Sequence, residues 1–516
     1  MQGHWKVSYW LLTLIFSLAS GRASCQLALL QQQEKTKITK IEFQGNQSFS
    51  DRILKKIMVT KESHWYARRY YHPDILKDDL DYLVLFYRDH GFLEIEVKDS
   101  LVVNETNKTA QIVITIFEGK RTIVGGLSFL GNQVFSEIQL LAQIKLRPGD
   151  PFSKSALEKD NLALLTLYAD AGYLEAKVTP QLSYSQQTHR MLITYYIDEQ
   201  KPVKIGDISI QGNFKTRASV IRRELDFNSG DIFNYSRVLA SQRKLYLTGL
   251  FKSVFIKPTR TDTSNGYRKD VAIEVAEKQN GELNVGIGYG TVDRLRGSFE
   301  VFQNNLWGTA RQLGLSCRAS FILQRAEISF TDPWLFATRT RTDVTGYAEA
   351  RQEPAFDLKS FGGRWALGRQ LSNFSRITLS YRYEKVTVSN IRGALSSATQ
   401  KGDTRSLTLS FVWDSRDDLF NARKGAFYSF DFESAGSILR GTNTFIKATL
   451  KGKWFFPLKL GLILASAVEA DWADNLGTSR EVPIQERFYA GGPTSVRGFQ
   501  EKYLGPLNES KYPIGG

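Results

Sequence analysis

Alternation of apolar and polar residues dominates the second half of the chain. In the first alternating segment, which begins near residue 282, one face consists of apolar side chains: Leu283, Val285, Ile287 and Tyr289. The other face of that segment holds asparagine and glycine. The same period of two recurs around residues 377–384, 428–433 and 446–456, with charged residues on the second face. Because side chains alternate between the two faces of a strand, this half is predicted to be all-β.

Two environments produce such alternation, a soluble β-sandwich and a barrel in a membrane. The segments are about ten residues long, the length that a tilted strand needs to cross a bilayer. Aromatic residues gather at their ends, for example Trp307, Trp334 and Trp413, where the girdles of a membrane barrel lie. Length and aromatic ends favour a transmembrane antiparallel barrel, with its apolar face toward lipid and its charged face toward the lumen.

The number of strands poses a physical problem. About eleven strands can be counted between residues 282 and 469 before a loop leads to Gly516. Bacterial barrels have an even number of strands, because an open edge in lipid leaves backbone groups unpaired at several kcal/mol each. The sequence therefore predicts an incomplete barrel over residues 280–516, truncated at its C-terminus or cut short in its reading frame.

The first half repeats one unit three times. Each copy opens with a short alternating segment that ends in Gly-Asn, at Gly45, Gly131 and Gly212. A helical pattern closed by a glycine follows in each copy, and then two more strands. The unit is predicted to be strand, helix, helix, strand, strand, in α+β domains over residues 36–119, 120–201 and 202–278. Each domain has roughly 80 residues, enough for a small core of its own.

The chain shows no sign of catalysis, metal binding or nucleic-acid binding. The motifs GxSxG, HExxH and GxxxxGK[ST] are absent, so no enzyme is predicted. Cys25 and Cys317 do not have the spacing of a disulfide framework or a metal site. The net charge of +15 is spread along the chain without a basic run, which argues against nucleic acid as a partner. Small mixed sheets can instead bind extended chains at an open edge, which we favour over a role as spacers.

The N-terminus has the pattern of an export signal. Lys6 precedes an apolar run over residues 10–18, and small residues follow. We expect residues 1–23 to be a signal peptide. A lipid-anchored Cys25 is the alternative, and Arg22 argues against it.

A glycine-rich stretch near the end of the chain breaks the alternation. Its motif residues are Gly491, Gly492, Val496, Arg497, Gly498 and Phe499. Two adjacent glycines and a proline cannot belong to an ordinary strand. A single long cation, Arg497, then stands on a loop fed by alternating strands. The residues alone allow a surface turn or a loop that reaches into the barrel.

Taken together, these features resemble one family, the outer-membrane assembly factors of the BamA and TamA type. The glycine-rich stretch is similar to the family's long loop with its VRGF/Y signature. Residues 413–417, which include Asp414 and Arg416, resemble with Gly425 the family's second barrel motif. Residues 305–308 and 330–334 also fit.

The resemblance implies a structure and a site. It implies polypeptide-transport-associated (POTRA) domains in the periplasm and a barrel of about 16 strands in the bacterial outer membrane. The loop would fold into the lumen, where Arg497 would meet an acidic wall residue. In the family that residue lies on strands after the loop, and this chain ends before them.

The resemblance also implies a mechanism without cofactor or nucleotide. Client strands would pair with sheet edges of the repeats and pass to a seam beside the first strand, near residues 283–290. The expected function is insertion of β-barrel proteins into the outer membrane. The implied partners are unfolded barrel clients, outer-membrane lipids, and periplasmic or lipoprotein accessory subunits. Alternatives are an autotransporter-type assembly factor and a two-partner secretion pore, against which three repeats without a plug helix argue.

Overall fold

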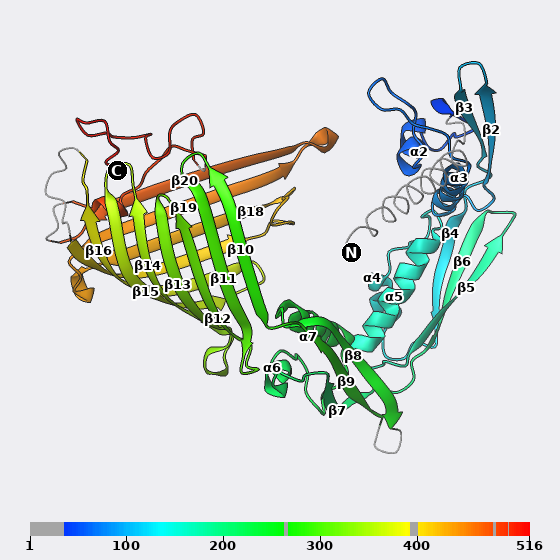
Figure 1. Cartoon of the computed structure of the whole chain (residues 1–516). Helices are drawn as coiled ribbons and strands as arrows, with labels where there is room; N and C mark the ends of the chain where they lie inside the picture. Colours follow the sequence, from blue (N-terminus) through cyan, green and yellow to red (C-terminus); the bar gives the residue numbers. More distant parts are fainter. Residues whose placement is uncertain (1–35, 263–266, 393–400, 478–480, 494) are drawn as a thin grey trace, which may run out of the picture. The chain divides into compact units, whose positions relative to one another are not determined.

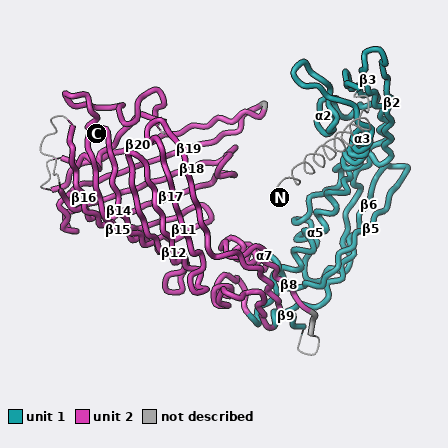
Figure 2. Tube along the Cα trace, in the orientation of Figure 1, with its two compact units in different colours: residues 1–206, 229–236, 261–269 teal, residues 207–228, 237–260, 270–516 magenta. Residues whose placement is uncertain are grey.

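A computed structural model describes residues 36–516, except residues 263–266, 393–400, 478–480 and 494. The expected signal peptide and Cys25 lie outside the described residues. The chain divides into two compact units, and the division runs through the third repeat (Figure 2). The first unit holds the first two repeats and part of the third. The second unit comprises residues 207–228, 237–260 and 270–516.

Each repeat has the predicted order of strand, helix, helix, strand, strand. The first consists of β1 (Lys37–Gln44), α2 (Asp51–Ile57), α3 (Pro73–Arg88), β2 (Glu96–Asn104) and β3 (Thr109–Phe117). The second consists of β4 (Ile123–Leu130), α4 (Glu137–Gln143), α5 (Lys154–Asp170), β5 (Lys177–Ser185) and β6 (Arg190–Asp198). The third consists of β7 (Lys204–Gln211), α6 (Ala218–Arg222), α7 (Tyr235–Leu247), β8 (Phe251–Asp262) and β9 (Arg268–Glu277). In every repeat the last strand lies between the other two, in the orders β1-β3-β2, β4-β6-β5 and β7-β9-β8.

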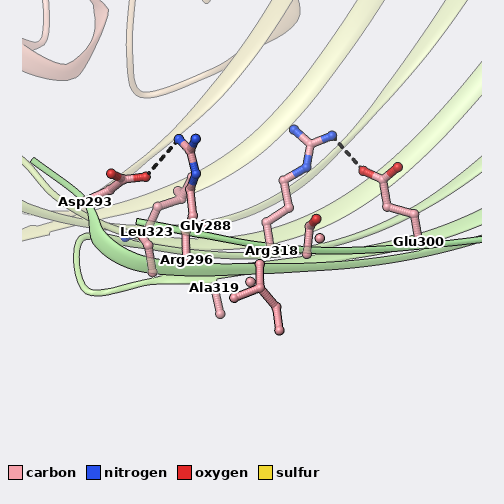
Figure 3. Close-up of a pocket in the computed structure, with 12 residues that line it drawn as sticks. Gly288, Asp293, Arg296, Glu300, Arg318, Ala319 and Leu323 are labelled. Atoms are coloured by element: carbon pink, nitrogen blue, oxygen red, sulfur yellow. Dashed lines mark hydrogen bonds and ion pairs between the residues drawn. The ribbon is translucent and has the colours of Figure 1, made fainter. Parts of the chain in front are cut away.

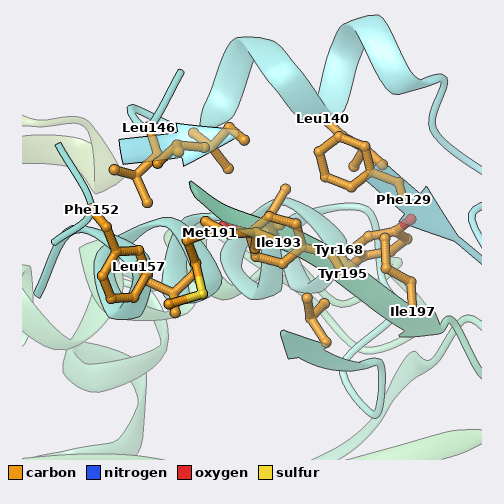
Figure 4. Packing of buried hydrophobic residues seen from close by; sticks show 14 residues of the cluster. Phe129, Leu140, Leu146, Phe152, Leu157, Tyr168, Met191, Ile193, Tyr195 and Ile197 are labelled. Atoms are coloured by element: carbon orange, nitrogen blue, oxygen red, sulfur yellow. The ribbon is translucent and has the colours of Figure 1, made fainter. Parts of the chain in front are cut away.

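The first two repeats each have a hydrophobic core of their own. In the second repeat, Tyr168 of α5 belongs to one buried cluster with Ile193 and Tyr195 of β6 (Figure 4). Leu164, one turn earlier on α5, belongs to the same cluster. The core residues of the first repeat all lie between Ile38 and Ile116. The buried side chains of the long helix, at helical spacing, and those of the middle strand, at every second position, thus form one core layer.

A buried polar residue on the long helix holds the loop that follows the short helix. Asp79, with no exposed surface, accepts hydrogen bonds from the backbone amides of Val59 (2.6 Å) and Thr60 (2.8 Å). Asp160 accepts two backbone amides at the same place in the second repeat, at 2.7 and 2.9 Å. Ser241 takes this position in the third repeat and accepts one amide at 2.8 Å. The carboxylates satisfy amides that would otherwise be buried without partners.

Consecutive repeats are joined by the ends of the long helices. Asp89, directly after α3, accepts hydrogen bonds from the hydroxyls of Ser153 (2.6 Å) and Ser155 (2.8 Å) in the second repeat. Asp170, at the end of α5, accepts the amide and hydroxyl of Ser236, both at 2.7 Å. Partial burial acts to raise the pKa of Asp89, but the serine hydrogen bonds hold it below its ordinary value.

The second unit contains an antiparallel sheet in which each strand pairs with the next. Its strands are β10 (Gly281–Gly290), β11 (Arg294–Leu306), β12 (Arg311–Ser320), β13 (Leu323–Asp332), β14 (Thr340–Gln352), β15 (Asp357–Gln370), β16 (Ser375–Ser389), β17 (Lys401–Asp414), β18 (Gly425–Ala435), β19 (Phe445–Pro457) and β20 (Ile463–Asn475). The described residues thus form an 11-stranded sheet with β10 and β20 at its edges (Figure 1). This confirms the predicted fold class. Among the described residues, no helix is both long and apolar enough to cross a membrane.

Short 3-10 helices lie between some of these strands and in the final segment: η1 (Leu335–Ala337), η2 (Ser437–Leu439), η3 (Lys459–Gly461) and η4 (Ile484–Glu486). Aromatic side chains form a cluster across three strands at one end of the sheet. The ring centroids of Trp413 and Tyr428 lie 5.4 Å apart, and those of Tyr428 and Trp454 lie 5.9 Å apart. The indole of Trp454 donates to the Tyr428 hydroxyl at 2.9 Å. Such a cluster fits the boundary between lipid and water, where amphipathic rings are favoured.

Candidate functional site on the inner face of the sheet

The first strand presents two different surfaces. Its apolar residues are all exposed, with Ile287 at 83% and Tyr289 at 77%. Its other face, here called the inner face because the charged side chains of the sheet lie on it, carries Gly286, Gly288 and Gly290. β10 hydrogen-bonds to β11 on one side, and its other edge has no partner strand in the part of the chain that the structure describes.

Two arginines from the neighbouring strands lie on this inner face (Figure 3). Arg296 pairs with Asp293 at 3.3 Å, and Arg318 pairs with Glu300 at 2.9 Å. A Cβ atom added at Gly288 would lie 2.9 Å from Nε of Arg296. The glycine therefore leaves room for the arginine side chain against the backbone of β10.

The glycine-rich loop has the tight turn that its sequence predicts. Gly491 and Gly492 have φ of 102° and 98°. A Cβ at Gly491 would lie 2.5 Å from the carbonyl oxygen of Gln500, so a side chain would clash as well as strain the backbone. Backbone hydrogen bonds hold the turn. The amide of Ser495 donates to the carbonyl oxygen of Gly492, and the amide of Gly492 donates to the carbonyl oxygen of Phe499 (3.1 Å).

The arginine of the loop does not reach the wall within the described residues. Arg497 is exposed, as are its motif neighbours Val496 and Phe499 at 42% and 50%. Among the described residues it makes no ion pair or hydrogen bond. Asp414, an acidic residue on an earlier strand, forms an ion pair with Arg416.

A different charged residue anchors the segment after β20 to the inner face. Glu486, in η4, is 7% exposed in its side chain and pairs with Arg382 of β16 at 2.9 Å. Lys447 of β19 lies 3.3 Å from the same carboxylate. Arg382 also pairs with Glu433 (2.8 Å) and Glu384 (3.0 Å). One guanidinium thus joins three carboxylates from two strands and the loop. Glu486 was not predicted from the sequence, although Arg382 and Glu433 lie at charged positions of strands that were predicted.

A second contact lies at the end of the sheet where β14 turns into β15. Ile484 and Tyr489 from the loop pack with Phe356, Leu358 and Val386 in a small hydrophobic cluster. Farther along the loop, an ion pair and a hydrogen bond reach the same end of the sheet: Lys502 to Glu353 and Asn508 to the carbonyl oxygen of Arg392. The loop is therefore attached at several points, none of which involves Arg497.

The second barrel motif forms a compact turn between β17 and β18. Arg416 donates to both carboxylate oxygens of Asp414, at 2.9 and 2.7 Å. Gly425 has φ of 105°, and a Cβ there would lie 2.4 Å from the carbonyl oxygen of Ser415. The guanidinium also lies 5.2 Å from the ring centroid of Phe427. These contacts give the motif a role in shaping the turn.

The two other stretches that resemble the family, residues 305–308 and 330–334, lie at turns of the sheet. Both turns contact the part of the third repeat that belongs to the second unit. The carbonyl oxygen of Gly308 accepts the backbone amide of Arg217 at 2.9 Å. Asn305 donates to the hydroxyl of Thr216 at 2.8 Å, and both residues are buried. These bonds fix the segment before α6 against the turn between β11 and β12.

In the turn between β13 and β14, Trp334 packs against two guanidinium groups. Those of Arg223 and Arg339 lie 5.2 and 5.5 Å from its ring centroid, within cation–π range. Trp334 lies just after the end of β13, and it contacts residues of this joint. Burial raises the pKa of Glu224 at the same joint, against the opposing effect of Arg223.

Comparison with known proteins identifies both halves of the chain. Residues 305–516 match the family model "Omp85 superfamily domain". Residues 36–119, 122–200 and 203–278 match the POTRA model, described as "Surface antigen variable number repeat". The chain belongs to the Omp85 superfamily, in its BamA and TamA type with POTRA repeats ahead of the sheet domain.

Individual relatives agree with that placement. The chain is 26% identical over 502 residues to the outer membrane protein assembly factor BamA of Neorickettsia risticii, and this covers 94% of the chain and 66% of the relative. It is 25% identical over 548 residues to BamA of Neisseria meningitidis serogroup B, covering 99% of the chain and 67% of the relative. The chain thus spans about two thirds of the length of these relatives.

A solved structure agrees in fold. The crystal structure of BamA from Haemophilus ducreyi lacking POTRA domains 1–3 superposes with a TM-score of 0.63 and 19% identity. It covers 77% of this chain and 80% of that one. At this identity the likeness concerns the fold alone.

Proposed function

We propose that this protein assembles and inserts β-barrel proteins in the bacterial outer membrane, with its POTRA repeats in the periplasm. Two relatives that align with almost the whole chain are named as outer membrane protein assembly factors. The observation that carries the proposal is β10, the first strand of the sheet, which has an exposed apolar face, a glycine-lined inner face and one edge without a partner strand among the described residues. A client strand can add to such an edge through backbone hydrogen bonds, whatever its side chains.

The seam strand is the site of insertion in this proposal. Its residues Leu283, Val285, Ile287 and Tyr289 face lipid, so a client strand paired with β10 has its own apolar residues on the same side. The glycines opposite keep the pairing free of side-chain hindrance toward the inner face. No cofactor takes part, because strand exchange replaces one set of backbone hydrogen bonds by another.

Clients are received first at an edge of the repeats. In each repeat one outer strand is covered by a loop: amides of Ser63, Gly149 and Gly230 donate to β1, β4 and β7. The opposite edges are β2, β5 and β8, and the last two contain Pro180 and Pro258. Proline blunts an edge because it lacks the amide that a new strand needs. β2 is therefore the edge we assign to client strands.

The remaining site residues serve the sheet domain. In the proposal the chain divides at residues 119, 201 and 278 into three POTRA domains and the barrel domain. Arg497 acts in the lumen, through an acidic partner outside the described residues. Outer-membrane lipids surround the apolar face, and accessory subunits bind the periplasmic repeats. The alternative function is that of an autotransporter-type assembly factor. The identity of the client proteins distinguishes this function from general barrel assembly.

Site-specific cross-linking in native membranes tests the seam. In a background with Cys25→Ser and Cys317→Ser, Asn284→Cys places a thiol on β10, and Ser298→Cys places one on the inner face of β11, one strand away from the edge. A client with a cysteine in its terminal strand should form a disulfide with residue 284 during insertion. The control at residue 298 should cross-link at least about tenfold less, because the disulfide requires Cα atoms within ~7 Å. Equal yields at both positions, or none at residue 284, would contradict insertion at β10.

A further inference from the structure

The three repeats cover their outer strand with the same pair of backbone hydrogen bonds. In the second repeat, Gly149 donates to the carbonyl oxygen of Val124 (2.8 Å), and the amide of Val124 donates to Asp150 (2.8 Å). In the third repeat, Gly230 and Asp231 make the same two bonds with Ile205, both at 2.8 Å. The two loop residues are adjacent in each case, in a Gly-Asp turn.

In the first repeat the same two bonds come from loop residues that are not adjacent in the chain. Ser63 donates to the carbonyl oxygen of Ile38 (2.9 Å), and the amide of Ile38 donates to Arg69 (3.0 Å). Residues 64–68 are therefore an insertion at a point where the other repeats have none. The framing hydrogen bonds are preserved, so the insertion adds a projection without changing the domain beneath it.

The insertion is a tight hairpin with two aromatic residues at its tip. His64 and Ala67 exchange backbone hydrogen bonds at 2.9 and 3.2 Å, which leaves Trp65 and Tyr66 as the turn residues. Trp65 is 96% exposed and Tyr66 is 70% exposed. Turn tips normally carry Gly, Asn, Asp or Pro. The two rings contact each other, with centroids 5.6 Å apart, and Tyr66 stacks on His64 at 5.5 Å, but neither ring belongs to the core of the domain. Most of their apolar surface is therefore available to something outside the domain.

The surroundings of the tip are positively charged. Residues 55–69 include five lysines or arginines and one acidic residue, Glu62. Lys55 pairs with Glu62 at 2.7 Å, so the acidic residue is already compensated. A pocket beside the hairpin is lined in part by basic and aromatic side chains: Lys55, Lys56, Lys61, His64, Tyr66 and Arg69.

We propose that this hairpin, residues 64–68, is a membrane contact that inserts Trp65 and Tyr66 at the surface of a bilayer with anionic phospholipids. Tryptophan and tyrosine favour the headgroup level of a membrane, and basic residues near it bind anionic headgroups. A protein partner fits less well. Two rings form too small an apolar patch for the ~800 Å² that each partner buries in a standard interface. The centre of such an interface is also depleted in charged residues.

The first two repeats alone suffice for a test. Each has its own sheet and core, so a fragment of residues 36–200 should fold, as circular dichroism can verify. Trp65 is the one tryptophan in that fragment, so its fluorescence reports directly on the tip. With phosphatidylcholine vesicles that contain phosphatidylglycerol, we expect a blue shift of the emission and co-sedimentation. Added salt should weaken both, because it screens exposed charges.

Three variants define the contact. Deletion of residues 64–68 joins Ser63 to Arg69 as in the other repeats, and it should abolish vesicle binding without changing the melting temperature. Arg68→Glu with Arg69→Glu should weaken binding by at least about twenty-five-fold, because the loss of each basic residue near an anionic surface costs about fivefold and the added carboxylates are repelled as well. The same reversal in the second repeat, Lys154→Glu with Lys159→Glu, should leave binding nearly unchanged.

Several results would overturn the proposal. One is the absence of a blue shift with anionic vesicles, and another is binding that survives the deletion. A shift produced by unfolded barrel peptides and not by vesicles would identify a protein partner instead. No client strand is needed in this experiment, so its outcome is independent of the proposed insertion function.

Discussion

Strands of the same alternating type bury opposite faces in the two halves of the molecule. In β3 of the first repeat, Ile112 and Ile114 are fully buried, and Val113 between them is on the opposite, half-buried face. In β16 and β17 of the sheet, Leu379 and Leu409 are exposed, whereas Arg382 is enclosed by three carboxylates. The repeats are built around an apolar core, and the sheet around a charged one. Period two alone does not say which face is inside, and the environment decides.

The largest effect should come from the charged core of the sheet. Arg382→Met leaves Glu384, Glu433 and Glu486 close together without their shared cation. Loss of one partner from a buried ion network costs about 3–5 kcal/mol. We expect the segment after β20 to detach, which limited proteolysis of residues 481–516 would detect.

Arg364 provides a matched control for that experiment. It is the register partner of Arg382 on the neighbouring strand, and its guanidinium donates a hydrogen bond to the hydroxyl of Ser380 at 3.0 Å. Arg364→Met should leave the protease sensitivity of the loop unchanged. If both variants expose the loop equally, Glu486 is not its anchor.

The apolar core of the repeats should respond to loss of volume. Leu164→Ala removes a fully buried side chain from α5, and such changes typically cost about 2–5 kcal/mol. Leu162→Ala, two residues earlier on the same helix, removes a side chain that is 64% exposed and should cost less than about 0.5 kcal/mol. Urea unfolding of residues 36–200 would measure both. Similar losses for the two leucines would contradict a separate core in the second repeat.

The outer face of the sheet should reject charge where the inner face accepts it. Leu409→Arg places a cation on the apolar face of β17, at a cost of about 2–4 kcal/mol near the middle of a bilayer. Ser410→Arg places it on the inner face, opposite Asp431, where it should be tolerated. The folded fraction in lipid vesicles, followed by the heat-dependent shift in gel mobility, would separate the two. Equal tolerance would mean that this face does not meet lipid.

How much of this could be read from the sequence depends on the distance between interacting residues. The strands, their number and their two faces follow from alternation, which is visible within about ten residues. The repeats were visible because Gly45, Gly131 and Gly212 recur at similar spacing. The tight turn at Gly491 and Gly492 follows from backbone sterics and is confirmed by their positive φ.

The contacts that position the site were not predictable in the same way. Glu486 meets Arg382 over 104 residues of chain, and nothing in the local pattern around Glu486 marks it as a wall contact. Thr216 meets Asn305 over 89 residues, so the turn motifs could be recognised without their role as a joint being seen. The hairpin at Trp65 became visible as an insertion once the hydrogen bonds to β1, β4 and β7 aligned the repeats.

The smallest effect should come from the link between the first two repeats, where neither kind of core is involved. The folded-state pKa of Asp89 lies below its ordinary value, so its contribution to the link is fully present above that ordinary value, about 3.9. The contribution is lost as the pH falls through the lower, folded-state pKa. Asp89→Asn should make the two repeats tumble more independently at neutral pH, as NMR relaxation of residues 36–200 would show. The wild type should acquire the same mobility only in acid, whereas Asp81→Asn, on an exposed part of α3, should behave as wild type throughout. Tumbling of the wild type that stays constant down to acid pH would remove Asp89 from the link and leave it to backbone contacts such as that between Thr122 and Gly91, at 2.7 Å.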